Sequence, residues 1–131
     1  MLELKDFEAA YNKVQEVALP TKLIKSDYFS DQTGNDIYLK PENMQLTGAY
    51  KIRGAYYKIS TLSEEEKAKG LITASAGNHA QGVALAAARQ GVKATIVMPT
   101  TTPLLKVNRT KDLGAEVILH GDVYDEHVHT H

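Results

Sequence analysis

The chain has 131 residues, about the size of one domain and enough to bury a modest core. Its 15 Lys and Arg residues nearly balance its 16 Asp and Glu residues, so the charge predicts neither a nucleic-acid partner nor an anionic membrane surface. The absence of cysteine excludes disulfides and thiolate metal sites, and no signal peptide or apolar run near the ~20 residues of a membrane span is evident. We therefore expect a soluble, cytoplasmic protein without a membrane partner.

The first half of the chain predicts short elements separated by turn residues. An amphipathic helix is expected over 4–17 and ended by Pro20, because four apolar residues recur at helical spacing: Phe7, Ala10, Tyr11 and Val14. Beyond it we expect an extended segment over 21–24, a helical turn over 26–33 closed by Gly34, a strand over 36–39, a loop over 43–48 and a helix from Lys51 to Ile59.

The second half alternates helices with strands. Ser63 and Glu66 form a capping-box signature at the start of a short helix, and Gly70 is its matching stop. The pattern then predicts a strand over 71–74, a helix over 78–90, a buried strand over 94–98, a helix over 104–113, a strand over 116–119 and a further helix from about residue 123. This alternation predicts an α/β fold with a parallel sheet of about three or four strands, covered by helices on both faces.

One stretch, KPENMQLTGAYKIRGA from Lys40 to Ala55, leads from a predicted strand into a helix whose first turn carries Lys51. The helix dipole is positive at that end, and together with burial it would favour a neutral amine. A neutral amine is the nucleophile that forms Schiff bases with carbonyl compounds such as pyridoxal phosphate. Position alone, however, favours an ordinary surface lysine, because most lysines are exposed and solvated.

A second stretch, SAGNH from Ser75 to His79, joins the end of a predicted strand to the start of a helix. Free backbone N–H groups at a helix start bind anions, and Gly77 would let the backbone approach a ligand closely. Ligands of open parallel sheets gather at the carboxyl ends of strands, where this loop falls. The alternative is a simple helix cap, in which Ser75 or Asn78 satisfies free amides, and the loop taken alone favours that alternative.

Together, in this order and at this separation, the first stretch and the run SAGNHAQG from Ser75 to Gly82 resemble the motifs of the threonine dehydratase (threonine ammonia-lyase) family of fold-type II pyridoxal-phosphate enzymes. The resemblance extends from about residue 20 to residue 124. It implies a flavodoxin-like small domain over 48–131 and an N-terminal segment, 1–47, that belongs to a large domain. It also implies pyridoxal phosphate as the cofactor, an amino acid as the small-molecule substrate and a homo-oligomer as the full-length enzyme.

The resemblance assigns roles to individual residues. Lys51 would hold the cofactor and, once free, remove the α-proton of the substrate, while Asn78 would hydrogen-bond the cofactor's phenolic oxygen. His79 is either an orienting donor or a packed, satisfied histidine, and we favour the second interpretation. Thr47 and Arg53 would support the lysine loop, Arg53 as an ion-pair partner. The substrate carboxylate would be held by the loop residues Ser75, Ala76, Gly77, Asn78 and His79.

The implied reaction is elimination from L-threonine to 2-oxobutanoate and ammonia, with L-serine giving pyruvate. Lys51 is followed by Ile52 and Arg53, as in the dehydratases and serine racemases, whereas cysteine-synthase-like enzymes have an acid directly after the lysine. The racemases typically have a serine where this chain has Ala76, and an alanine cannot exchange a proton, so elimination is favoured. A serine racemase relative and a non-catalytic truncated or engineered domain remain alternatives. The resemblance does not separate isoleucine biosynthesis from a degradative role.

Two parts of such enzymes are missing from the sequence: a Gly-rich loop for the cofactor phosphate and a Ser or Cys opposite the pyridine nitrogen. We therefore expect an N-terminal fragment that folds but does not catalyse the reaction alone. The chain ends in alternating histidines, His127, His129 and His131, which could bind a metal. A frayed or added tail is the preferred interpretation, and no metal is predicted.

Overall fold

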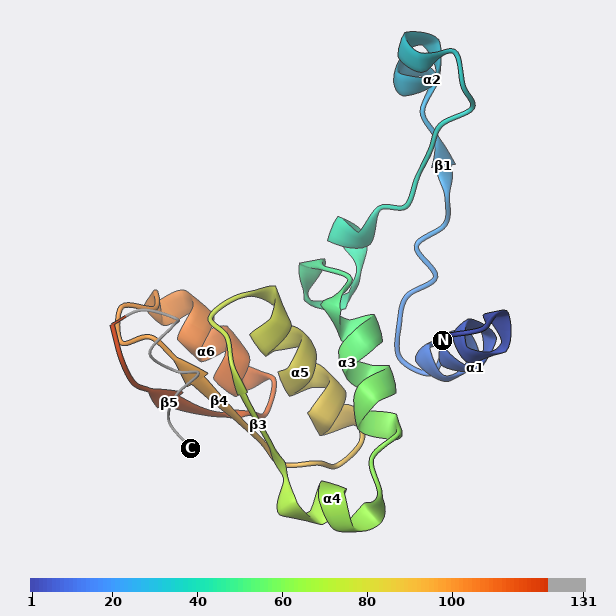
Figure 1. Ribbon diagram of the computed structural model, residues 1–131. Helices are drawn as coiled ribbons and strands as arrows, with labels where there is room; N and C mark the ends of the chain where they lie inside the picture. Colours follow the sequence, from blue (N-terminus) through green and yellow to red (C-terminus); the bar gives the residue numbers. More distant parts are fainter. Residues whose placement is uncertain (123–131) are drawn as a thin grey trace.

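The computed structural model describes residues 1–122, so the helix predicted from about residue 123 and the three C-terminal histidines lie outside this range. The elements in chain order are α1 (Leu4–Val14), β1 (Ile24–Lys25), α2 (Asp27–Thr33), β2 (Tyr38–Leu39), η1 (Glu42–Met44), η2 (Leu46–Gly48), α3 (Lys51–Ser60), α4 (Glu64–Lys69), β3 (Leu71–Ala74), α5 (Asn78–Arg89), β4 (Ala94–Met98), α6 (Leu104–Asp112) and β5 (Glu116–Leu119) (Figure 1). Element types follow the prediction, except that two 3₁₀ helices, η1 and η2, occupy most of the expected loop over 43–48. Within the described residues, no helix is long and apolar enough to cross a membrane.

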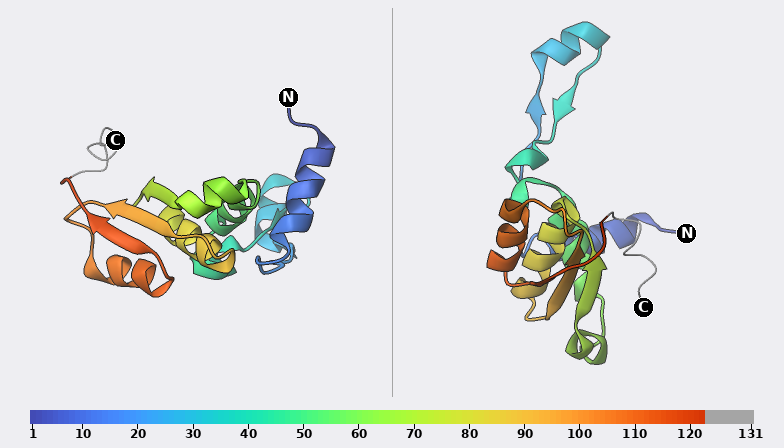
Figure 2. Two further views of the ribbon diagram at one scale, coloured as in Figure 1. Left: turned by 90° about the horizontal axis from the view of Figure 1, so that it is seen from below. Right: turned by 90° about the vertical axis from the view of Figure 1, so that its left-hand side faces the viewer.

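A parallel sheet in the order β3-β4-β5 forms the centre of the α/β unit, residues 51–122. Thr73 pairs with Ile96, which in turn pairs with Val117. The predicted α/β class is thus confirmed. Helices α5 and α6 both lie on one side of the strands (Figure 2), so within residues 1–122 the predicted cover of both faces is not found. The reason is topological, because right-handed crossovers that step in one direction across a sheet place their helices on the same face.

The core lies between this face of the sheet and the helices α5 and α3. Ile96 and Met98 point to it from alternate positions of β4, and Ile52 enters it from α3; all three are 0% exposed. The central helix α5 contributes small buried residues, among them Ala80 and Ala84. Small side chains let this helix pack closely against both neighbours, which accounts for its alanine-rich sequence.

The short helix α4 is held by the predicted capping box. The Ser63 hydroxyl accepts from the N–H of Glu66 at 3.1 Å, and the Glu66 carboxylate accepts from the N–H of Ser63 at 2.8 Å. Gly70 ends the helix with φ 81°, a conformation that is easiest for glycine. A Cβ there would also stand 3.0 Å from the carbonyl oxygen of Lys93, so this turn needs glycine for space as well.

Helix α1 is anchored only at its C-terminal end. It stops at Val14, short of the expected residue 17. Of the four apolar residues at helical spacing, Val14 is buried, whereas Phe7 and Tyr11 are 60% and 63% exposed, because no neighbouring element of the described chain covers them. Burial is confined to Val14 and Val17, near which the Tyr56 hydroxyl of α3 donates to the Glu16 carboxylate at 2.8 Å.

Residues 19–41 form an arm that projects from the α/β unit (Figures 1 and 2). Its strands β1 and β2 pair in antiparallel fashion over two residues each, so the strand predicted over 36–39 is shortened. Between them lies α2, which is capped at its start by Ser26, whose hydroxyl accepts from the N–H of Phe29 at 3.3 Å, and at its end by Gly34 with φ 69°.

Candidate active site

Lys51 is the first residue of α3, as the sequence predicts. Its side chain is exposed, and its amine lies 5.5 Å from the centre of the Tyr50 ring, within cation–π range. The described chain therefore shows the exposed, ordinary surface lysine that position alone favours, and the place of Lys51 at the helix N-terminus matches the prediction.

A buried glutamine fixes the loop that precedes Lys51. Gln45 is 4% exposed, and its side-chain amide donates to the carbonyl of Leu19 at 2.9 Å. Its Oε1 also accepts from the N–H of Leu19 at 2.9 Å. Both polar ends of the buried amide are thus satisfied. Gln45 consequently fastens the lysine loop to the start of the arm.

A two-pronged ion pair holds the same loop to the first turn of α3. The Arg53 Nε lies 2.9 Å from one oxygen of Glu42, and its Nη2 lies 2.8 Å from the other. These hydrogen bonds from Arg53, helped by one from Thr21, lower the pKa of Glu42 to about 2 against the opposing effect of burial. The prediction that Arg53 serves as a structural ion-pair partner is confirmed.

The loop from Ser75 to His79 starts with a buried cap. The Ser75 hydroxyl oxygen accepts from the N–H of Gly77 at 3.3 Å and from the N–H of Ala80 at 3.2 Å. The capping interpretation therefore holds for Ser75, although its own O–H is used in neither bond and stays able to donate. Asn78 is the first residue of α5, and both it and His79 are exposed.

Helix α5 brings the two motifs into contact. A Cβ at Gly82 would stand 3.0 Å from the carbonyl carbon of Lys51 and 3.1 Å from its Cβ, so the first turn of α3 rests directly on α5. Asn78 lies one helical turn before Gly82 on the same helix. The structure thus brings Lys51 beside the helix that starts with the second motif.

His79 lies within the electrostatic reach of Lys51. Its imidazole lines a cavity of about 280 Å³ together with residues of α3 and β3. Partial burial lowers the pKa of His79, and the charge of Lys51 lowers it further. The residue as a whole is nevertheless exposed, so the fully packed histidine that we favoured is not found.

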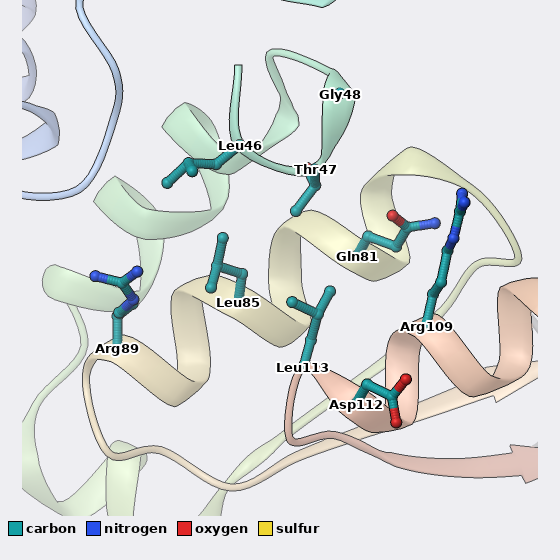
Figure 3. A pocket seen from close by; sticks show the side chains of 9 residues that line it. All are labelled: Leu46, Thr47, Gly48, Gln81, Leu85, Arg89, Arg109, Asp112 and Leu113. Atoms are coloured by element: carbon teal, nitrogen blue, oxygen red, sulfur yellow. The ribbon is translucent and has the colours of Figure 1, made fainter. Parts of the chain in front are cut away.

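Thr47 faces a separate cavity of about 610 Å³ between the lysine loop, α5 and α6 (Figure 3). Gln81 of α5 and Arg109 of α6 line the same cavity, whereas Lys51 and residues 75–79 do not. Thr47 has φ 65°, and among the described residues its buried hydroxyl has no hydrogen-bond partner. Its predicted support of the lysine loop stays a prediction.

Sequence reasoning gave no role to three of the residues that build this site. Gln45 and Glu42 stand inside the lysine motif. Leu19, the partner of Gln45, is 26 residues away, and Arg53, the partner of Glu42, is 11 residues away in the same motif, so no helix or strand spacing reveals either pair. Gly82 did carry a signal. A glycine inside an alanine-rich helix costs about 1 kcal/mol relative to alanine, which indicates a close neighbour.

Fold and site together define a class: an α/β unit that presents Lys51, at the start of α3, beside the loop between β3 and α5. The chain belongs to the pyridoxal-phosphate dependent enzyme family, whose model matches residues 14–130. Over 126 residues it is 54% identical to the L-threonine ammonia-lyase of Thermotoga maritima, an alignment that covers 96% of this chain and 31% of that protein. The predicted family resemblance is thus confirmed.

Solved structures give the same result for the fold. The processed form of threonine deaminase isoform 2 from Solanum lycopersicum matches 95% of this chain and 36% of its own, with a TM-score of 0.82 and 43% identity. Maize serine racemase matches 96% of this chain and 39% of its own, with a TM-score of 0.86 and 34% identity. The chain therefore spans about a third of the length of these relatives.

The donor set fits one end of pyridoxal phosphate, the cofactor of this family. Lys51 offers an exposed primary amine for the aldehyde carbon, and Asn78 offers an exposed amide for a ring oxygen. The sequence has no Gly-Gly-Gly run that could form a cradle for the phosphate. Within residues 1–122, no group of three or more metal-binding side chains is gathered.

Proposed function

We propose that this chain is the lysine-bearing part of an enzyme that removes ammonia from L-threonine and L-serine, giving 2-oxobutanoate and pyruvate. The observation that carries the proposal is the packing of the first turn of α3, with Lys51, against the helix that begins with Asn78. The likeness to proteins named L-threonine ammonia-lyase and threonine deaminase supports this choice of substrate.

In this proposal Lys51 works through its Nζ atom. It would hold the cofactor and then, as a free amine, accept the α-proton of the substrate. When bound, pyridoxal phosphate supplies an electron sink for the negative charge left on the α-carbon. Asn78 would donate to the phenolic oxygen of the ring and so keep the ring oriented.

The substrate carboxylate would be bound by the loop of Ser75, Ala76, Gly77, Asn78 and His79. Backbone N–H groups at the start of α5 carry the positive end of the helix dipole, which favours a carboxylate there. The Ser75 O–H is a further donor, since its oxygen accepts from Gly77 and Ala80. Binding at this loop would place the α-carbon on the side of α5 that faces Lys51.

Racemisation is the second candidate, because maize serine racemase has a similar structure. A racemase needs a group on the far face of the substrate that returns a proton to the α-carbon. The methyl group of Ala76 cannot exchange a proton, and this observation favours elimination. Chiral chromatography of L-serine reactions distinguishes the two, because elimination yields pyruvate and racemisation yields D-serine.

The proposal extends to the arrangement of the whole protein. Residues 1–47 would belong to a large domain, residues 48–131 to a small one, and the protein would be a homo-oligomer. The exposed apolar side chains of the arm support a further domain, since Leu23, Tyr28 and Phe29 are 64%, 69% and 47% exposed.

The test uses an exchange protein, in which this chain replaces the matching segment of the Thermotoga maritima L-threonine ammonia-lyase. We expect it to form 2-oxobutanoate from L-threonine with pyridoxal phosphate, and we expect no turnover from the 131-residue chain alone. Lys51→Ala should lower kcat at least ~10³-fold, since the acting amine is gone. Lys58→Ala, which removes an exposed lysine of the same helix, should leave kcat near the unmodified value. Sustained turnover by Lys51→Ala would contradict the assignment.

A further inference from the structure

Gly82 occupies an unusual position in α5. It is buried in the interior of a helix whose buried neighbours include Ala80, Ala84 and Ala86. An added Cβ would stand 3.0 Å from the carbonyl carbon of Lys51 and 3.1 Å from the N atom of Ile52. Both are backbone atoms, so no side-chain rotation could make room. The first turn of α3 would itself have to move.

Gly54 offers a direct comparison. It is also helical, it belongs to the lysine motif, and a Cβ there would meet nothing within 4 Å. The lack of a side chain at Gly54 is therefore not required by packing. One difference between the two helical glycines matters for the site: Gly82 packs from α5 against the Lys51 backbone of α3, whereas Gly54 faces open space.

We propose that Gly82 is a positioning residue that sets how closely the Lys51 backbone rests on α5, and hence how far Lys51 lies from Asn78 and His79. For catalysis this inference rests on the proposed function, in which Lys51 acts on the substrate. The contact itself does not depend on that function.

The packing around Lys51 explains why a side chain added at position 82 would displace Lys51. Ile52 follows Lys51 directly and is 0% exposed, so it holds α3 in the core. A Cβ at position 82 would press on the backbone of this turn from the side of α5, so the turn and α5 would have to move apart at Lys51. The displacement would carry Lys51 away from the start of α5, where His79 feels its charge.

The first experiment measures this distance electrostatically in the 131-residue chain, without cofactor. The pKa of His79 is followed by NMR in the chain and in its Lys51→Met variant. Loss of the lysine charge should raise the pKa of His79, and the size of that rise reports the coupling of the two groups. Repeated in a Gly82→Ala background, the rise should be measurably smaller, because Coulomb coupling weakens with distance. Lys58, which lines the same cavity as His79, is unchanged throughout.

Two control variants distinguish a change in the position of Lys51 from a general loss of folding stability. Gly54→Ala adds the same methyl group in open space and should leave the coupling unchanged. Val107→Ala removes a side chain that is 3% exposed on α6, so it destabilises the core while leaving the contact at Gly82 intact. If Gly82→Ala does not fold, it is remade together with Gly54→Ala, which raises helix propensity. A chain that unfolds even then overturns the proposal, because the contact would serve folding as a whole.

The second experiment measures kcat and KM of the exchange protein. A shift of ~1 Å in a reacting group can cost ~10²-fold in rate. The contact at Gly82 calls for a shift of a few tenths of an ångström, so Gly82→Ala should lower kcat roughly threefold to tenfold with little change in KM. Gly54→Ala should leave both near the unmodified values. Unchanged coupling in Gly82→Ala, or a kcat equal to that of Gly54→Ala, overturns the proposal. If the unmodified exchange protein forms no 2-oxobutanoate, the proposed function fails, and the coupling measurement alone decides the role of Gly82.

Discussion

The α/β unit and the arm are stabilised in opposite ways. In the α/β unit, residues 51–122, apolar side chains such as Ile52 and Ile96 are completely buried. In the arm, residues 19–41, the aromatic side chains of Tyr28 and Phe29 are mostly exposed, and two short strands make a single small ladder. The segment between them is fixed mainly by polar groups, with Gln45 as its buried centre.

This difference places Lys51 at a boundary between two kinds of structure. On one side Ile52 ties it to the apolar core, and on the other side the Glu42–Arg53 pair ties the preceding loop to the same helix. A lysine held in this way can stay exposed to a ligand while its backbone is fixed from both directions. Fixing the backbone of a lysine therefore does not require burial of its side chain.

The largest loss of stability should follow from truncating a side chain of the apolar core. Ile52→Ala removes a fully buried side chain and should lower the free energy of unfolding by about 2–5 kcal/mol. Phe29→Ala removes a larger side chain from the arm, yet it should cost less than about 1 kcal/mol, because that ring is exposed and contacts mainly Tyr28 at 5.2 Å. Urea unfolding of both variants measures the contrast. If Phe29→Ala lowers the free energy of unfolding as much as Ile52→Ala does, the arm is packed as tightly as the α/β unit.

A smaller loss of stability should follow from removing the charge of Glu42 in the Glu42–Arg53 ion pair, and this loss should depend on pH. The pKa of Glu42 is about 2 in the folded chain and is lowered from 4.5, so its ionised form is stabilised by folding. That contribution is complete above pH ~4.5 and is lost as the pH falls toward ~2. Glu42→Gln should therefore lower the free energy of unfolding by about 1–3 kcal/mol at pH 7, and the difference from the unmodified chain should vanish near pH 2.

Glu116→Gln is the matched control for this charge removal. Glu116 pairs with Lys93 at 3.4 Å, but both side chains are more than half exposed. An exposed pair of this kind contributes about 0–1 kcal/mol, so the control should change stability little. A Glu42→Gln variant with the same small, pH-independent change would mean that polar contacts do not hold the junction.

The elements of the α/β unit could be predicted because their signals are local. The capping box at Ser63, the stop at Gly70 and the alternation of apolar strands with helices are each visible within a few residues, and the structure places helices and strands there. The two site motifs were also visible, through their resemblance to a known family. What joins them was not, because the contact of Gly82 with Lys51 links separate elements.

The failures of prediction share a physical cause as well. The apolar spacing of α1 correctly indicated a helix but could not reveal whether a neighbour would cover Phe7 and Tyr11. Cover on both sheet faces was inferred from alternation, which fixes the order of elements and not the face of each helix.

The smallest expected effect concerns two adjacent residues of the lysine loop. Thr47 and Gly48 both have positive φ, 65° and 73°, yet only one of them is glycine. A left-handed conformation costs a residue with a Cβ about 1–2 kcal/mol, and Thr47 also buries a hydroxyl that has no hydrogen-bond partner among the described residues. Thr47→Gly should therefore raise the free energy of unfolding, by less than about 1 kcal/mol because the unfolded chain gains freedom.

Gly48→Ala should have the opposite sign. Its Cβ would meet only the carbonyl oxygen of Asn43 at 4.0 Å, so the expected loss of about 1 kcal/mol comes from backbone conformation and not from a clash. Urea unfolding of the two variants gives the signs directly. If Thr47→Gly lowers stability instead, the threonine side chain must contribute more through its contacts in the cavity of Figure 3 than its conformation costs. The junction would then rest on packing at Thr47 as well as on the polar bonds of Gln45 and Glu42, and its contrast with the α/β unit would be weaker.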